Sequence, residues 1–295
     1  LGRPFYPLRF LNLLPLSHMF GQSLATFIPP MLPGVCVFMR GYSPTAIVHQ
    51  IHNRRISVLV CVPKILDVLR EHVLQIAPEV ADTPADSPHV ARRWWRYRRI
   101  HRLFGMKYWC FIVGAAPLDP DLEAFWSRLG FVVVQGYGLT ETTAALTVNL
   151  PGAHKIGTVG RPLPGTAVRV ADDGELLFRG GQVFAGYWGN ESATAETLER
   201  DGWFHSGDVG EVDDEGFVRI TGRKKEILVT AGGKNVAPAV LEDRVRAHAL
   251  VDQCLVVGDG QPFIGALVTL DREALTVWAE ARGLSGSAED LLDHA

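Results

Sequence analysis

Short apolar runs alternate with amphipathic stretches through the first half of this 295-residue chain. The runs are rich in β-branched and aromatic residues, which predicts buried strands. The stretches between them have helical periodicity, and three begin with proline at or near the first helical position, where its missing N–H costs nothing. This alternation predicts a mostly parallel sheet covered by helices. The expected strands are Gly34–Met39, Ser57–Val62, Cys110–Val113 and Phe131–Gln135, and the expected helices are Pro44–Asn53, Pro63–Gln75, His89–Phe104 and Pro120–Leu129.

The pattern changes after Leu150. Turn signals become frequent between Gly157 and Gly222 and flank short apolar runs. These features predict a small antiparallel β-subdomain, followed from Arg223 onward by a compact α+β unit. The expected elements are strands at Thr166–Val170, Glu175–Phe178 and Phe217–Ile220, then Glu226–Thr230, a helix at Ala239–Ala247, and strands at Gln253–Val257 and Gly265–Leu270.

The chain is therefore expected to have an α/β fold with two domains. The large domain comprises residues 1–222, of which 1–150 form parallel or mixed sheets with helices and 151–222 form the β-rich subdomain. Residues 223–295 form a small C-terminal α+β domain, which we expect to be incomplete. Val80–His89 contains two prolines, two aspartates and a serine and is expected to be a surface loop.

Composition excludes some classes of partner. The chain is 47% hydrophobic and 21% charged, which suits an ordinary globular core. Its net charge of −3 gives no reason to expect nucleic acid as a partner. The four cysteines form no CxxC pair, and Cys36, Cys61 and Cys110 lie within apolar runs. We expect buried thiols in a reducing compartment, and therefore a cytoplasmic protein, with peripheral contact to a membrane left open.

Two features bear on membranes and on the ends of the chain. The chain opens at Leu1 without a methionine or a basic lead-in, so we expect no signal peptide and a chain cropped at one or both ends. Phe20–Met39 is uncharged and long enough to suggest a membrane span. Pro29-Pro30 and Pro33-Gly34 interrupt it, so we expect a short helix and a short strand there instead.

The segment Gln135–Thr143 carries the strongest chemical signal. Gly136 and Gly138 bracket Tyr137 just beyond an apolar strand, so the backbone can approach a ligand closely while the tyrosine ring stacks on a purine. Thr140 offers a hydroxyl to phosphate, as Thr142 and Thr143 do, and Glu141 is a hard-oxygen ligand for Mg²⁺. By itself, the pattern suits an ordinary strand-to-helix turn equally well.

Three other places complete a candidate nucleotide site. The turn Gly114-Ala115-Ala116-Pro117 follows another expected strand, and ligands of open α/β sheets bind where strands end. Asp208 could accept hydrogen bonds from both ribose hydroxyls, although an isolated aspartate there is more often a turn or cap residue. Arg223 could donate to the same ribose or to phosphate. Alternatively, Arg223 is a solvated surface charge at a domain edge, together with Lys224 and Lys225.

Together these motifs resemble the adenylate-forming superfamily of acyl-CoA synthetases, adenylation domains and luciferases. The last part of the chain is most similar to long-chain fatty-acid–CoA ligases. The resemblance covers nearly the whole chain, with several motifs in the family's order. The matching runs are Leu14–Gly21, Gly114–Leu118, Gln135–Thr143, Gly202–Asp208, Gly222–Ile227, Gly232–Asp243 and Pro262–Leu267.

The resemblance implies ATP- and Mg²⁺-dependent formation of an acyl-adenylate from a long-chain fatty acid, followed by transfer to CoA. It places Ala115 and Ala116 in the adenine pocket and Tyr137 in a stack on the base. It also places Gly114, Gln135, Gly136 and Gly138 among the nucleotide-binding residues. It implies that Thr140 and Glu141 face the phosphates and Mg²⁺. It also implies that Asp208 holds the ribose, with Arg223 beside it. It also places His18 on the acyl side, Lys225 at a hinge, and Gly232 and Gly233 beside the pantetheine arm of CoA.

Two departures from the family pattern shape the expectations. No Ser/Thr/Gly-rich loop ending in Pro-Lys-Gly precedes His18, and no lysine motif follows Lys234, the last lysine before Ala295. We therefore expect a fragment with little or no ligase activity alone, which appreciable acyl-CoA formation would overturn. A fatty acyl-AMP ligase, a peptide-synthetase adenylation domain and a non-catalytic nucleotide- or acyl-binding relative stay open. Acyl chain length and oligomeric state are not determined.

Two basic features have less specific interpretations. Arg92–Arg102 combines six arginines with Trp94, Trp95 and Tyr97, and it could contact an anionic membrane surface. A surface helix paired with acidic neighbours is the preferred interpretation, and liposome co-sedimentation would decide between the two. His49 and His52 have helical spacing, but no third ligand is nearby in the sequence, which favours a solvated helix face over a metal site.

Overall fold

The computed structural model describes residues 7–81, 90–246, 248, 250–280 and 282–284. The chain divides into two compact units, and the division runs through its β-rich part. The domain boundary expected at residue 223 stays a prediction. The first unit comprises Leu1–Val170, Leu177–Ser206 and Val212–Arg219, and the second comprises Ala171–Leu176, Gly207–Glu211 and Ile220–Ala295.

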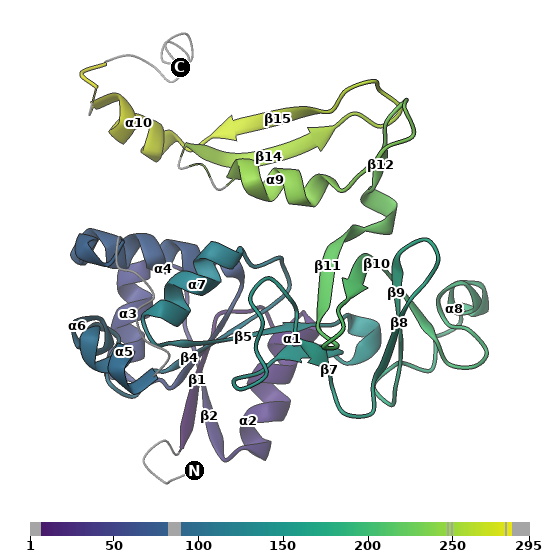
Figure 1. Cartoon of the computed structure of the whole chain (residues 1–295). Helices are drawn as coiled ribbons and strands as arrows, with labels where there is room; N and C mark the ends of the chain where they lie inside the picture. The colour runs from purple at the N-terminus through teal and green to yellow at the C-terminus, as the bar shows by residue number, and fades with distance from the viewer. Residues whose placement is uncertain (1–6, 82–89, 247, 249, 281, 285–295) are drawn as a thin grey trace. The chain divides into compact units, whose positions relative to one another are not determined.

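A seven-stranded sheet with the order β2-β1-β3-β4-β5-β6-β7 forms the centre of the first unit (Figure 1). The first five strands in that order are parallel, and the last two pair antiparallel. The expected mostly parallel sheet is confirmed. The strands are β1 Leu8–Asn12, β2 Gly34–Phe38, β3 Val58–Cys61, β4 Cys110–Val113, β5 Val132–Tyr137, β6 Thr147–Asn149 and β7 Arg161–Pro162.

Alternate residues of these strands enter two separate apolar clusters. Leu59 and Phe111 belong to one cluster, whereas Val58 and Cys110 belong to the other. Since successive side chains of a strand point to opposite faces, both faces of the sheet are buried. The first cluster lies under α3 Pro44–Asn53, α4 Pro63–Ile76, α6 Arg98–Phe104 and α7 Pro120–Arg128, and the second lies under α1 Met19–Gln22, the π-helix Ser23–Phe27 and α2 Ile28–Met31.

The strand β1 was not expected from the sequence, yet it lies inside the sheet between β2 and β3. Its five residues, Leu-Arg-Phe-Leu-Asn, include an arginine in second position and an asparagine at the end, so the segment is too short and too polar to read as a buried run. The Arg9 guanidinium donates a hydrogen bond from Nη1 to the carbonyl oxygen of Arg54 at 2.9 Å. Tertiary pairing therefore overrides the weak local pattern.

Strand β2 lies at one edge of the sheet, and its outward side chains are poorly covered. Val35 is 45% exposed and Phe38 is 53% exposed, and Met31 of the neighbouring helix α2 is 79% exposed. Cys36 of the same strand is only half buried, whereas Cys61 and Cys110 are fully buried, as expected. Burial raises the pKa of the Cys61 and Cys110 thiols, and both remain free thiols.

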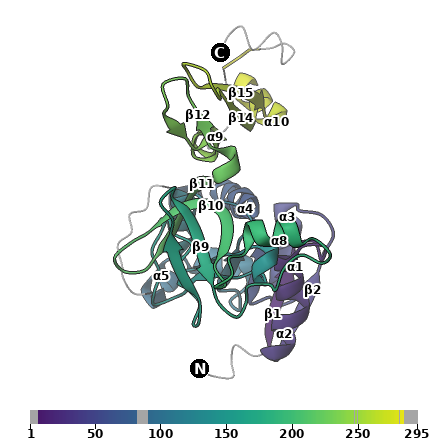
Figure 2. The same ribbon diagram turned by 90° about the vertical axis from the view of Figure 1, so that its right-hand side faces the viewer.

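The β-rich part contains a four-stranded sheet with the order β11-β10-β9-β8 (Figure 2). Three of its strands were expected, but β10 was not, because glycines and charged residues interrupt its apolar pattern. Helix α8, Glu191–Thr197, begins after Asn190, whose side chain accepts a hydrogen bond from the Ala193 amide. The strands are β8 Ala167–Val170, β9 Glu175–Arg179, β10 Phe204–Val212 and β11 Val218–Arg223.

The remainder of the second unit is a small α+β arrangement. Strands β14 and β15 pair antiparallel, as β12 and β13 do, and α10 packs through Leu275 and Ala279. The expected element at Glu226–Thr230 is instead a 3₁₀ turn followed by a two-residue strand. The elements are the 3₁₀ turn Lys224–Glu226, β12 Leu228–Val229, β13 Asn235–Val236, α9 Pro238–Arg246, β14 Val251–Val257, β15 Gly265–Leu270 and α10 Arg272–Glu280.

Two expectations about surface and membrane segments have different outcomes. Most of the expected loop at Val80–His89 lies outside the described residues, which resume at α5, Val90–Arg96. Residues 20–39 form short helical segments and strand β2, as the prolines predicted. Among the described helices, none is both long enough and apolar enough to cross a membrane.

A substitution of Trp126 tests the packing of the first apolar cluster. Its ring is fully buried near the rings of Phe104, Phe111 and Phe131, and its indole N–H donates to the carbonyl oxygen of Leu66 at 3.2 Å. Trp126→Phe is expected to lower the free energy of unfolding by about 1–3 kcal/mol, because it opens space and orphans a buried acceptor. Urea unfolding measures this.

Trp188 offers the matched control, because its side chain is fully exposed. Trp188→Phe should change the free energy of unfolding by less than about 0.5 kcal/mol. Equal effects of the two substitutions would contradict the assigned packing of Trp126.

Candidate functional site

A tight turn follows β5 and carries the glycine-threonine motif. The Thr142 hydroxyl accepts a hydrogen bond from the Leu139 amide at 2.9 Å and lies 3.1 Å from the Leu139 carbonyl oxygen, to which it donates. A Cβ at Gly138 would lie 2.6 Å from the backbone of Ala144, so no larger residue fits there. The turn itself therefore requires Gly138 and Thr142, whether or not a ligand binds there.

The three threonines of the turn have different environments. Thr142 is fully buried and its hydroxyl closes the turn, while the Thr143 hydroxyl donates to the carbonyl oxygen of Gln182 at 3.0 Å. Thr140 is exposed. Thr143 and Ala144 have positive φ angles of 56° and 73°, an uncommon conformation for residues with a Cβ. Thr143 is exposed as well, so Thr140 and Thr143 present their side chains to solvent while Thr142 does not.

Glu141 is held by a loop that the sequence did not point to. Its carboxylate oxygen Oε1 accepts a hydrogen bond from the Tyr187 hydroxyl at 2.8 Å, and its main-chain oxygen accepts one from the Phe184 amide at 2.8 Å. Partial burial, and then the Glu141 carboxylate, raise the pKa of Tyr187. The only sequence signal for this loop was its cluster of glycines at 180, 181, 186 and 189.

The turn after β4 lies directly beside the turn after β5. A Cβ at Gly114 would lie 3.3 Å from the carbonyl oxygen of Gly136 and 3.1 Å from the ring of Phe20. Ala115 adopts a positive φ of 66°, and both it and Ala116 are exposed. The structure therefore brings the two predicted loops together at the carboxyl ends of neighbouring parallel strands.

The side chains of β5 itself are divided between core and surface. Gln135 is buried, and its backbone pairs with Val113 on one side and Asn149 on the other. Tyr137 is half buried, and its ring centre lies 5.8 Å from that of Phe178. Tyr137 therefore keeps part of its ring accessible, whereas Gln135 contributes mainly to the sheet.

His18 is exposed at the start of α1, where it occupies the N-cap position. The preceding turn needs the glycine of the motif, because a Cβ at Gly21 would lie 2.2 Å from the carbonyl oxygen of Pro15. Buried Asn12 accepts a hydrogen bond from the Leu14 amide at 3.0 Å and so fixes the exit from β1. Phe20 of the same helix contacts Gly114, which places α1 against the turn after β4.

Asp208 and Arg223 come together in the second unit. The Arg223 Nε lies 2.9 Å from Asp208 Oδ1, and the two residues belong to neighbouring strands β10 and β11. Asp208 is only 3% exposed, whereas the side chain of Arg223 is about half exposed. A carboxylate paired with a guanidinium through one oxygen still has lone pairs that can accept hydrogen bonds from hydroxyl groups.

Lys224 is anchored and is not the solvated charge considered from the sequence. Its Nζ lies 2.6 Å from Asp173 Oδ2 and 2.9 Å from Glu175 Oε2. The hydrogen bond to Asp173, and then the one to Glu175, raise the pKa of Lys224. The hydrogen bond from Lys224, and then the one from the Glu175 amide, lower the pKa of Asp173. Lys225, the next residue, is exposed.

Gly232 and Gly233 lie in the exposed turn between β12 and β13. The Gly233 amide donates to the carbonyl oxygen of Thr230 at 2.8 Å, and its φ of 75° requires the conformational freedom of glycine. These residues, with Lys225, belong to the second unit, whereas His18, Thr140 and Glu141 belong to the first.

The described part of the chain contains no cluster of three or more His, Cys, Asp or Glu residues that could hold a metal ion. His49 Nε2 lies 2.8 Å from the Asn53 side-chain nitrogen on α3. The interpretation of His49 and His52 as a solvated helix face stays a prediction. A magnesium ion that arrives with nucleotide phosphates needs only one or two protein carboxylates, so the single carboxylate of Glu141 suits that role.

Comparison with known families identifies the chain. A family model described as AMP-binding enzyme matches residues 4–188, and one described as AMP-binding enzyme C-terminal domain matches residues 225–284. The chain belongs to the AMP-binding enzyme family. The resemblance stated from the motifs is thereby confirmed.

Among the relatives that the chain resembles are long-chain-fatty-acid–CoA ligases. The long-chain-fatty-acid–CoA ligase FadD15 of Mycobacterium bovis is 53% identical over 192 residues, which are 65% of this chain and 32% of that protein. The chain thus spans about a third of the length of the curated relatives it matches.

Solved structures confirm the adenylate-forming fold. O-succinylbenzoate coenzyme A synthetase from Bacillus subtilis, in complex with ATP and magnesium, matches with a TM-score of 0.69 at 25% identity, covering 93% of this chain and 55% of that one. The Mycobacterium tuberculosis fatty acyl CoA synthetase matches with a TM-score of 0.60 at 27% identity, covering 91% and 51% respectively.

The two neighbouring threonines of the turn allow a matched stability test. Thr142→Val removes the hydroxyl that closes the turn and leaves the Leu139 amide without its acceptor. We expect the free energy of unfolding to fall by about 1–3 kcal/mol. The exposed Thr140→Val should change it by less than about 0.5 kcal/mol. Urea unfolding of both variants decides, and equal stabilities would contradict the assigned role of Thr142.

The Lys224–Asp173 pair predicts a pH dependence. Because the pKa of Asp173 is below its ordinary 3.8, its contribution is present above that value and is lost as the pH falls through the lowered pKa. Because the pKa of Lys224 is above 10.5, its contribution is present below that value and is lost as the pH rises through the raised pKa. The difference in unfolding free energy between wild type and Asp173→Asn should therefore be largest near neutral pH and shrink at both extremes. A difference that is constant with pH would contradict the pairing.

Proposed function

We propose that this chain takes part in the ATP-dependent activation of a long-chain fatty acid, which is converted to an acyl-adenylate and then transferred to CoA. A carboxylate is a poor electrophile, and its attack on the α-phosphate of ATP creates a good leaving group. The observation that carries the proposal is the pair of adjoining turns at the ends of β4 and β5, where Gly114 lies against Gly136 and Glu141 is braced by Tyr187.

The adenine side of the nucleotide is assigned to the first unit. Tyr137 would stack on the base, because its ring is half buried and only partly covered by Phe178. Ala115 and Ala116 are small and exposed on the adjoining turn, so they would line the edge of the base beside Gly114. Gly136 and Gly138 would let the backbone approach the nucleotide, while Gln135 would hold the strand in register.

The phosphate side follows from the same turn. The exposed Thr140 would donate its hydroxyl to a phosphate oxygen, and Glu141 would hold the magnesium that accompanies ATP. When bound, the magnesium would neutralise charge on the phosphates. The Tyr187 hydrogen bond fixes the Glu141 carboxylate before any ligand arrives, which reduces the reorganisation that binding requires.

The ribose and the second half of the reaction are assigned to the second unit and to α1. Asp208 would accept hydrogen bonds from the ribose hydroxyls, with Arg223 beside it holding the carboxylate in place. His18 would lie on the acyl side, Lys225 would be the hinge residue, and the turn Gly232-Gly233 would approach the pantetheine arm of CoA. These last three roles rest on the family resemblance and on exposure at their positions.

The substrate class rests on the relatives. FadD15 is a long-chain-fatty-acid–CoA ligase, and the structural match from M. tuberculosis is a fatty acyl CoA synthetase. With ATP, Mg²⁺, fatty acid and CoA supplied, an enzyme containing this chain should form acyl-CoA. Accumulation of acyl-AMP without thioester would favour the fatty acyl-AMP ligase. Binding without turnover would favour the non-catalytic relative.

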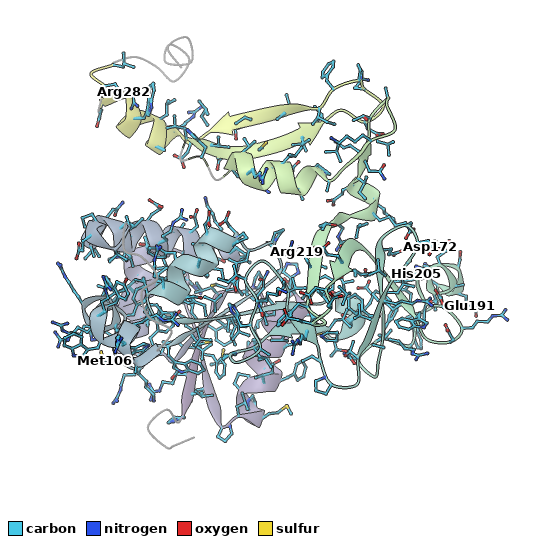
Figure 3. All side chains as sticks on the ribbon, viewed as in Figure 1. Met106, Asp172, Glu191, His205, Arg219 and Arg282 are labelled. Atoms are coloured by element: carbon cyan, nitrogen blue, oxygen red, sulfur yellow. The ribbon has the colours of Figure 1, made fainter. Side chains whose placement is uncertain are left out.

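Peripheral contact with an anionic membrane is a further part of the proposal. Trp95 is 69% exposed on α5, and Met106, labelled in Figure 3, is 55% exposed just beyond α6. The guanidinium of Arg98 lies 4.9 Å from the Trp95 ring centre. Acidic pairing is present as well, since Arg99 lies 3.5 Å from Glu79. Arginines beside protruding aromatic side chains suit a headgroup layer, which the liposome measurement tests.

Asp208 provides the direct test of nucleotide binding. Asp208→Asn keeps the size of the side chain but removes the charge that strengthens hydrogen bonds from ribose. A hydrogen bond to a charged group is worth about 1.5–3 kcal/mol, so AMP affinity should fall about 10- to 100-fold. Calorimetric titration with AMP measures this, and Asp201→Asn, an exposed turn residue, is the control. Undetectable AMP binding by the wild-type chain would contradict the proposed function.

A further inference from the structure

Glu175 is a buried carboxylate with two strong partners. It is the first residue of β9 and is only 3% exposed. Its Oε1 accepts a hydrogen bond from the Gly207 amide at 2.8 Å, and its Oε2 accepts one from the Lys224 ammonium at 2.9 Å. Burying a carboxylate is unfavourable unless it is both paired and hydrogen-bonded, so this arrangement calls for an explanation beyond local stability.

Each partner of Glu175 is the chain neighbour of a residue assigned to ribose. Gly207 directly precedes Asp208, and Lys224 directly follows Arg223. The three strands involved are adjacent in the sheet, in the order β11-β10-β9, and all five residues belong to the second unit. One carboxylate therefore fixes the backbone before Asp208 and the side chain after Arg223 at the same time.

The surrounding contacts reinforce this arrangement. Asp173 Oδ1 accepts a hydrogen bond from the Glu175 amide at 3.1 Å, and Asp173 Oδ2 lies 2.6 Å from the Lys224 ammonium. Gly207 has a φ of 71°, a conformation that its hydrogen bond to Glu175 helps to select. The backbone conformation just before Asp208 therefore depends on a residue of the neighbouring strand β9 as well as on β10 itself.

We propose that Glu175 is a positioning residue for the nucleotide sugar. It holds Gly207 of β10 and Lys224 so that Asp208 and Arg223 keep their 2.9 Å pairing in the geometry that receives the ribose hydroxyls. This inference rests on the proposed function, which assigns the ribose to Asp208. It adds a residue that touches neither nucleotide nor reacting atoms and acts through the two segments that do.

The first experiment compares two nucleotides. Calorimetry measures the affinity of the chain for AMP and for 2′,3′-dideoxy-AMP, which lacks the ribose hydroxyls. Glu175→Gln should weaken AMP binding about 10-fold, a loss equal to one charge-assisted hydrogen bond, and should leave the dideoxy analogue unchanged. A merely structural defect would weaken both nucleotides alike, and that result would overturn the proposal.

A matched control and a second variant keep this test decisive. Glu215→Gln is the control, because Glu215 also pairs with a lysine, at 3.0 Å from Lys155, but lies in the first unit. It should leave the ratio of the two affinities unchanged. Lys224→Met removes the cation that pairs with buried Glu175 and is expected to lower the free energy of unfolding, so urea unfolding is used to check that it is folded. In the folded variant the ratio should fall in the same direction. An unchanged ratio in both Glu175→Gln and Lys224→Met would overturn the proposal.

Amide hydrogen exchange separates this proposal from the proposed function. Glu175→Gln should speed exchange of the Gly207 and Asp208 amides about 10-fold without any nucleotide present, whereas Glu215→Gln should not. If exchange rises but the wild-type chain binds no AMP, Glu175 still holds the Asp208 segment, but the proposed function fails and the role toward the nucleotide sugar fails with it. If the wild type binds AMP and exchange in Glu175→Gln is unchanged, the positioning role fails alone.

Discussion

The rest of the first unit depends on one constraint, the parallel register of β1, β3, β4 and β5. Because these strands start and end together, the turns that follow β4 and β5 emerge side by side at the same edge of the sheet. Both faces of the strands are buried, so a one-residue slip would exchange the two apolar clusters and is strongly disfavoured. The contact between Gly114 and Gly136 is a consequence of that register.

The glycines and threonines of the motif show how one sequence can serve fold and site together. Gly138 is required by the approach of Ala144, and Thr142 closes the turn with its own hydroxyl. Neither role involves a ligand, yet both fix the position of Glu141 between them. In the second unit, Glu175 has a comparable relation to Asp208 through the Gly207 amide. In both places a buried polar group holds the segment that carries a carboxylate assigned to the nucleotide.

The sequence predicted most elements whose signals are local. Strands β4 and β15 and helix α3 have the predicted bounds, since apolar runs, proline and turn residues mark their ends. It missed β1 and β10, whose pairing comes from neighbours distant in the sequence. For the site, the motifs identified Glu141, Asp208 and Arg223, but not Tyr187 or Glu175. Those two act through contacts 46 and 32 residues away, and no spacing rule in a single sequence reveals such contacts.

The outer edge of β2 has a consequence for how the chain behaves in solution. An edge strand presents unpaired backbone groups, and here exposed Val35 and Phe38 lie along it with Met31 nearby. No lysine or proline interrupts Gly34–Phe38, although such gatekeepers commonly protect edges. Two copies could therefore add strand to strand and extend the sheet between molecules. Self-association of this chain should rise with concentration, and a charged residue at position 35 or 38 would be the natural way to suppress it.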